Sequence, residues 1–123
     1  MELLHAVMGW VSLAYGLLIW LVDPFACETQ VEREIKSPGG DRAAVVFQID
    51  CGATTPFNTQ VSIFPSDKES FSADRYPPVL VLRDKHVLAI EWITDDLLKI
   101  RVPSDVRIFK QTNEAGGVEI IYE

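Results

Sequence analysis

The stretch "QVEREIKSPGGDRAAVVFQID", residues 30–50, decides the fold class of this chain. Apolar and charged residues alternate along 30–36, the period of extended strands, and 42–50 returns with Val45, Phe47 and Ile49 on one face and Ala44, Val46 and Gln48 on the other. Between the two runs, "SPGGD" supplies a proline with a fixed φ angle and two glycines that tolerate positive φ angles, as a tight reversal requires. The sequence therefore predicts an antiparallel hairpin here.

Short strand-like runs separated by turn residues continue along the rest of the chain. They cover residues 59–65, 79–83, 87–93, 97–102, 106–110 and 118–122. A turn at "TDD" would place Trp92 opposite Leu98 in a second hairpin, and "TNEAGG", residues 112–117, would join the last two runs in a third. We therefore expect a mainly β fold: an antiparallel meander, as a small sandwich or half-open barrel, preceded by one N-terminal hydrophobic helix.

The N-terminal segment differs in kind from this pattern. Residues 3–22, "LLHAVMGWVSLAYGLLIWLV", contain no Asp, Glu, Lys or Arg. As a helix they would be about 30 Å long, the thickness of the hydrocarbon core of a bilayer. We expect residues 1–25 to form a transmembrane anchor or signal-like helix and residues 26–123 an antiparallel β domain. A cleaved signal peptide, a lipid-modified leader and a soluble helix remain as alternatives to an uncleaved anchor.

The size, composition and charge limit the classes of function. A chain of 123 residues has room for one domain, and its 48% hydrophobic content excludes a disordered chain. Without Glu2 and Asp23, sixteen acidic residues stand against eleven basic ones, so the region after the apolar run has a formal charge of −5. A nucleic-acid partner is therefore not expected, because binding phosphates requires a basic face.

The two cysteines, Cys27 and Cys51, are the sharpest chemical feature of the sequence. They form no CxxC motif, and His5 and His86 are too few to complete a zinc site, so we expect no metal and no cofactor. A Cys27–Cys51 disulfide would close a loop of about 25 residues and stabilise the fold by about 3 kcal/mol in the loop-entropy model. Lipidation of Cys27 and two unpaired thiols are the alternatives.

Candidate site residues lie in two loops, 52–58 and 66–78. At the first loop, Asp50 just before it and Thr54 and Thr55 within it offer oxygens to a ligand, although such side chains more often bond to the backbone of their own turn. Phe57, Phe71 and Tyr76 would form a contact patch for a protein partner wherever they are exposed. No residue is predicted to be catalytic, since Ser62 lies outside any Gly-x-Ser-x-Gly motif.

Three segments resemble a group of small bacterial envelope proteins that have no assigned activity: "SPGGDRAAVVFQIDCGATTPFNTQVSIFP", "IEWITDDLLKIRVP" and "VEIIYE". Members of this group begin with a signal or lipoprotein leader and share an SPDGK-type hairpin and a DCGATT-type turn. The resemblance implies an extracytoplasmic β domain. Arg33 and Lys36, which follow the apolar run, would by the positive-inside rule place the domain in the cytoplasm, but the cysteines and the resemblance outweigh these two charges.

We therefore expect a single-pass protein of the bacterial inner membrane, anchored through residues 3–22, with its β domain outside the cytoplasm as a binding or assembly module. A lipid-anchored or secreted form is the alternative location. The alternative functions are an envelope enzyme with a site near Asp50, Thr54 and Thr55, and a small accessory subunit of a membrane complex. The ligand, the protein partner and the oligomeric state do not follow from the sequence.

Overall fold

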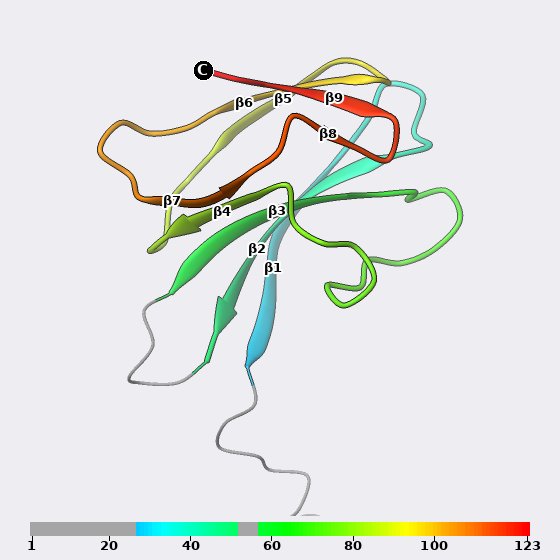
Figure 1. Cartoon of the computed structure of the whole chain (residues 1–123). Helices are drawn as coiled ribbons and strands as arrows, with labels where there is room; N and C mark the ends of the chain where they lie inside the picture. The colour runs from blue at the N-terminus through cyan, green and yellow to red at the C-terminus, as the bar shows by residue number, and fades with distance from the viewer. Residues whose placement is uncertain (1–26, 52–56) are drawn as a thin grey trace, which may run out of the picture.

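The computed structural model describes residues 27–51 and 57–123 of the chain (Figure 1). The predicted anchor, residues 1–25, and two candidate site residues, Thr54 and Thr55, lie outside this part. The described residues form strands and turns without any helix, so the prediction of a mainly β domain is confirmed there.

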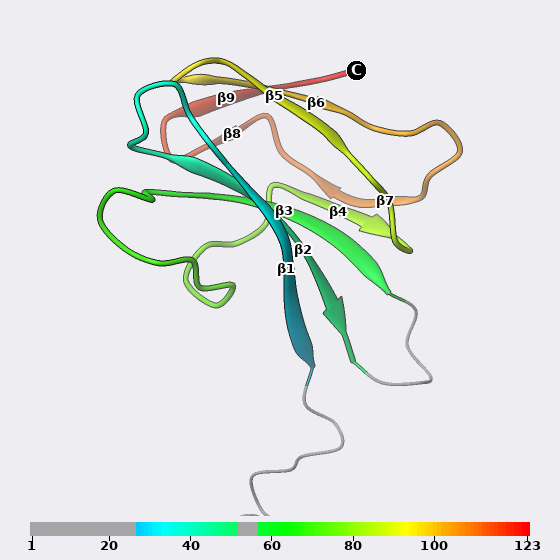
Figure 2. The same ribbon diagram turned by 180° about the vertical axis from the view of Figure 1, so that it is seen from behind.

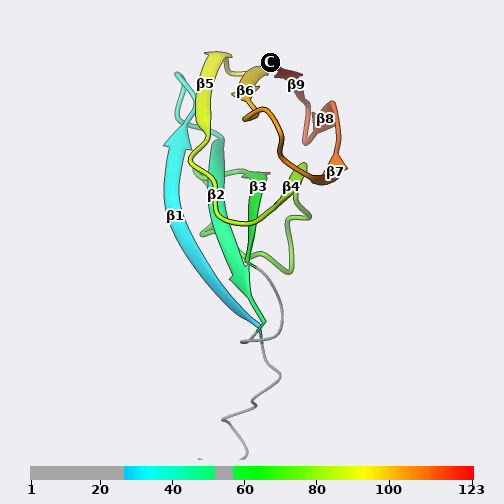
Figure 3. The same ribbon diagram turned by 90° about the vertical axis from the view of Figure 1, so that its left-hand side faces the viewer.

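The strands belong to two sheets (Figures 1 and 2). The first sheet is antiparallel and contains, in spatial order, β1 (Glu28–Lys36), β2 (Ala43–Asp50), β3 (Asn58–Phe64), β4 (Leu80–Arg83) and β7 (Ile108–Gln111). The second sheet contains β5 (Ala89–Thr94), β6 (Leu97–Arg101), β9 (Val118–Tyr122) and β8 (Glu114–Ala115). Figure 3 shows the second sheet lying across one end of the first.

Two of the three predicted hairpins are present. The β1–β2 turn is closed by hydrogen bonds from Ser37 N to Arg42 O at 2.8 Å and from Gly40 N to Ser37 O at 2.9 Å. Gly40 has a positive φ angle of 77°, which glycine adopts readily and which the "GG" pair was expected to supply. In the second hairpin, β5 pairs with β6 and Trp92 stands opposite Leu98, as predicted.

The third predicted hairpin is wrong. Residues 106–110 and 118–122 do not pair with each other, because β7 joins β4 in the first sheet and β9 joins β6 in the second. The β6–β9 pair is parallel, which departs from a simple antiparallel meander. Instead, β9 forms a short hairpin with β8, turned by Gly116 and Gly117, which both have positive φ angles. In this pairing Val118 and Ile120 of β9 are buried in the core.

The core lies between the two sheets. It joins side chains from facing strands of both sheets and contains Ala44, Val46, Val61, Ile63, Leu80, Leu82, Leu98, Ile100, Val118 and Ile120. A second apolar cluster covers the opposite face of the first sheet, where Phe47 and Phe64 are buried beneath the segment that follows β3. Strand β2 is therefore buried on both faces, which accounts for the continuous apolar run "AAVVF".

The disulfide predicted between Cys27 and Cys51 is present, with the two Sγ atoms 2.08 Å apart. It joins the start of β1 to the residue after β2, one step beyond the Glu28–Asp50 pair. Because the hairpin turn lies at the other ends of β1 and β2, the disulfide marks one end of the first sheet and the turn marks the other.

Candidate functional site

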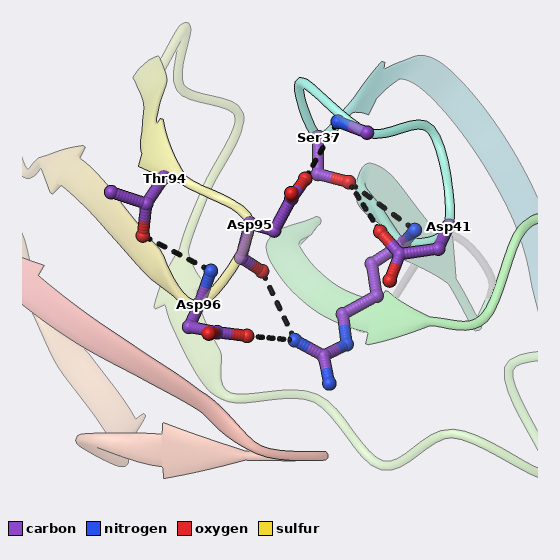
Figure 4. A network of polar contacts seen from close by, with 7 residues as sticks. Ser37, Asp41, Thr94, Asp95 and Asp96 are labelled. Atoms are coloured by element: carbon purple, nitrogen blue, oxygen red, sulfur yellow. Dashed lines mark hydrogen bonds and ion pairs between the residues drawn. The ribbon is translucent and has the colours of Figure 1, made fainter.

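The hairpin turn at residues 37–42 forms the first wall of the candidate site. Gly39 N donates a hydrogen bond to Asp95 Oδ1 at 2.6 Å, which ties this turn to the β5–β6 turn. Arg42 Nη1 donates to the carbonyl oxygen of Asp95 at 3.0 Å and to Asp96 Oδ1 at 2.6 Å (Figure 4). The two turns, which are more than fifty residues apart in the chain, therefore form one rigid corner of the domain.

Bonds within each turn support this corner. Ser37 Oγ donates to Asp41 Oδ1 at 3.1 Å and accepts a hydrogen bond from Arg42 N at 3.3 Å. On the other side, the backbone N–H of Asp96 donates to Thr94 Oγ1 at 3.1 Å (Figure 4). Such short-range bonds hold Asp, Ser and Thr in turns, and here they orient the groups that join the two sheets.

The segment between β3 and β4, residues 65–79, forms the second wall. Phe71 packs on Phe47 and Phe64, with ring centroids 5.1 Å and 5.6 Å apart, and Tyr76 packs on Phe64 at 5.9 Å. Ser62 Oγ also donates to the carbonyl oxygen of Tyr76 at 3.0 Å. Phe71 and Tyr76 are half-buried and hold this segment on the first sheet, so they do not form an exposed aromatic patch.

The chain between β7 and β8 forms the third wall. Thr112 N donates to the carbonyl oxygen of Val79 at 2.8 Å, and the phenol of Tyr122 donates to the carbonyl oxygen of Thr112 at 2.6 Å. Burial of the Tyr122 ring raises the pKa of its hydroxyl to about 12, while the hydrogen bond to Thr112 acts in the opposite direction and is the smaller effect. The wall is therefore held by hydrogen bonds to Val79, just before β4, and to Tyr122 on β9.

These three walls enclose a groove with a volume of about 620 Å³. Its floor is apolar and is lined by Ile63, Phe64, Val79 and Ala115, together with the prolines at 65, 77 and 78. Its rim carries charges of both signs, from Asp41, Arg42, Asp67, Lys68, Lys110 and Glu114. We call this feature the groove.

The rim charges differ in how firmly they are held. The guanidinium of Arg42 is already paired with Asp96. Within the described residues, neither Lys68 nor Lys110 forms an ion pair, so both ammonium groups are free to meet a ligand.

The predicted site residues are not brought together. Asp50 lies at the end of β2 beside the disulfide, and Phe57, whose side chain is 47% exposed, lies just before β3 at the same end of the first sheet. Tyr76 alone among the predicted residues lines the groove. Across residues 27–51 and 57–123, no cluster of three His, Cys, Asp or Glu side chains is placed to hold a metal ion.

The sequence indicated one wall of the groove, the loop at residues 66–78, but not the other two. The segment 66–78 was recognised as a candidate binding loop, and it contributes Lys68 and Tyr76. Arg42 and Glu114 were missed because the turn before β2 and the β8–β9 hairpin, to which they belong, are far apart in the chain. The paired glycines of each turn were visible in the sequence, but nothing in the sequence indicated that the two turns would meet.

Comparisons with models of known protein families, with curated proteins and with solved structures found no match to this chain. Within the part of the chain that the structure describes, no helix is long and apolar enough to cross a membrane.

Proposed function

We propose that this chain is a membrane-anchored binding module of the bacterial cell envelope, and that it holds an extended polypeptide segment in the groove. The observation that carries the proposal is the groove itself. Its volume of about 620 Å³ lies within the usual range for ligand sites. An apolar floor with a rim of both charge signs suits an apolar side chain flanked by charged residues, which is a common pattern in polypeptides.

The position of the groove supports a role as a receptor for such a segment. Asp41 and Arg42, at the groove, directly precede β2, whereas Cys51, at the disulfide, directly follows it. The strand between them is about 27 Å long at the usual rise per residue. With residues 3–22 as a membrane anchor joined at the disulfide end, the groove would lie at the end of β2 farther from the anchor.

The disulfide supports a location outside the cytoplasm, because structural disulfides persist in oxidising compartments. The apolar run at residues 3–22 and the resemblance to envelope proteins support anchoring there. To test the location, intact cells are treated with a membrane-impermeant thiol reagent, with and without prior reduction. Labelling only after reduction, without lysis, is the expected result. Labelling that requires lysis would refute the extracytoplasmic location.

Binding in the groove is tested with the full-length protein in zwitterionic detergent and a displayed library of random peptides. The Asp67→Trp variant places a bulky ring at the rim, whereas Asp74→Trp places the same ring on the same segment outside the groove. We expect selected peptides to bind Asp67→Trp about tenfold more weakly, a loss of about 1.4 kcal/mol in binding free energy. Their affinity for Asp74→Trp should be unchanged. Equal binding to both variants, or no selected peptide, would refute the groove as the site.

A further inference from the structure

Strand β7 is an open edge of the first sheet, since β4 is its one neighbouring strand among the described residues. The register between β4 and β7 shifts between Val81 and Leu82, which leaves Phe109 without a partner on β4. The side chains of Ile108 and Phe109 are 43% and 54% exposed. An edge of this kind offers unpaired backbone groups and apolar side chains to a further strand.

The opposite edge of the same sheet is acidic. Strand β1 carries Glu28, Glu32 and Glu34 along an exposed edge and has an irregularity between Val31 and Arg33. Strand β7 contains no acidic residue, so the two edges of the sheet differ in charge.

Three basic residues lie on or beside β7. Arg107 directly precedes the strand, Lys110 lies within it, and Arg83 ends the neighbouring β4; Arg83 N donates to the carbonyl oxygen of Arg107 at 2.9 Å. None of the three forms an ion pair within the described residues. The guanidinium of Arg107 lies 5.5 Å from the centre of the Phe109 ring.

The local charge is the reverse of that of the domain. Asp84 and Asp105 are the acidic residues of the segments 83–85 and 105–110, so these segments carry a formal charge of +2. The region after residue 23 has a formal charge of −5. Basic residues that remain unpaired in an acidic domain are suited to an acidic partner.

We propose that β7 is a docking edge for an extended acidic peptide segment of a partner protein, which adds to the first sheet as a further strand. The free backbone edge selects a polypeptide over a lipid or a nucleic acid, because strand addition uses main-chain hydrogen bonds. The basic residues select an acidic sequence. A second copy of β7 fits poorly, because antiparallel pairing of two such edges would place Arg107 and Lys110 beside like charges.

The direct test uses the full-length protein in zwitterionic detergent and a fluorescent octapeptide of alternating glutamate and valine. Two control peptides separate charge from strand pairing. One replaces glutamate with lysine, and the other keeps glutamate but carries N-methyl groups on alternate backbone nitrogens along one edge. We expect the first peptide to bind and both controls to lose at least about tenfold in affinity, or about 1.4 kcal/mol. Equal binding of the N-methylated peptide would refute strand addition.

Variants of the protein locate the site. Arg107→Glu should weaken binding of the glutamate–valine peptide by about tenfold, and Phe109→Ser should weaken it without a change in charge. Lys36→Glu makes the same charge reversal on the β1 edge and should leave the affinity unchanged. Thermal unfolding of each variant checks that the fold is intact, and the backbone amide signals of residues 108–111 should shift on binding.

Three further outcomes would overturn the proposal. The first is absence of binding by the glutamate–valine peptide at millimolar concentration. The second is self-association through residues 108–111 in the absence of peptide, which would make a second copy the occupant. The third is binding of anionic lipid vesicles that is lost in the Arg107→Glu variant when no peptide binding is seen. Since the Asp67→Trp variant leaves β7 unchanged, failure at the groove and failure at this edge are distinguished.

Discussion

The indole nitrogen of Trp92 donates a hydrogen bond to the carbonyl oxygen of Ile35 at 2.8 Å. Trp92 lies on β5, an edge of the second sheet, and Ile35 lies on β1, an edge of the first. One side chain therefore joins the two edges, and its ring also packs against the core.

Replacing Trp92 with phenylalanine tests this contact. The variant keeps an aromatic ring but removes the donor, so the free energy of unfolding should fall by about 1 kcal/mol. Trp92→Leu should cost more, because packing is lost together with the hydrogen bond. Urea unfolding measures both changes. Equal stability of Trp92→Phe and the unchanged protein would show that the hydrogen bond contributes nothing.

The corner at Asp95 gives a second prediction. A Cβ atom at Gly39 would lie 2.9 Å from Asp95 Oδ2, so Gly39→Ala should displace the carboxylate that accepts the hydrogen bond from Gly39 N. Asp95→Ala removes the same contact from the other side. In a double-mutant cycle the two losses of unfolding free energy should therefore be less than additive, with a coupling energy of about 0.5–1 kcal/mol. Additive losses would show that the two residues act independently.

The Arg42–Asp96 ion pair should contribute less to stability than the 2.6 Å distance between Arg42 Nη1 and Asp96 Oδ1 suggests. The side chain of Asp96 is 76% exposed, so water and salt screen the attraction. We expect Asp96→Asn to change the free energy of unfolding by at most about 0.5 kcal/mol, and less at high salt. A larger effect that persists at high salt would indicate that water and salt do not screen the pair.

The disulfide should supply a large share of the stability. The cysteines are 24 residues apart, and opening a loop of this size costs about 3 kcal/mol in the loop-entropy model. Reduction should therefore lower the melting temperature markedly. The double variant with Cys27→Ala and Cys51→Ala should melt at that lower temperature and should not respond to reductant. A further decrease of its melting temperature on reduction would point to another cause.

The raised pKa of Tyr122 predicts a loss of stability at high pH. Its pKa is raised from 10.0 to about 12, so the folded protein holds the phenolic proton more tightly than the unfolded chain does. The stabilisation from this proton is complete below pH 10 and is lost as the pH rises through 10 to about 12. Urea unfolding across this range should show a steeper fall for the natural protein than for Tyr122→Phe. Parallel curves would contradict the prediction.

The sequence predicted the parts of this fold that depend on neighbouring residues. The "SPGGD" turn and the Trp92–Leu98 pair follow from local turn chemistry and strand alternation, and both are present. The pairing of β9 was not predictable in this way. Alternation identified Val118 and Ile120 as residues of one strand face, but it carries no information about which sheet that strand enters.

The groove shows the same limit more strongly. Its walls come from three turns or loops that meet only after both sheets are packed, so no spacing in the sequence records them. The aromatic residues Phe71 and Tyr76 were correctly singled out as loop residues. Their orientation toward the sheet depends on Phe47 and Phe64, which lie on other segments of the chain.

The position of β9 has a consequence for biosynthesis. This strand lies between β6 and β8, so the second sheet remains in two pieces until residues 118–122 have left the ribosome. The core residues on β6 stay uncovered during that time, because Val118 and Ile120, which share the core with them, have not yet been made. A nascent chain stalled before residue 118 should therefore be sensitive to protease and bind chaperones, and the domain should fold only after its synthesis is nearly finished.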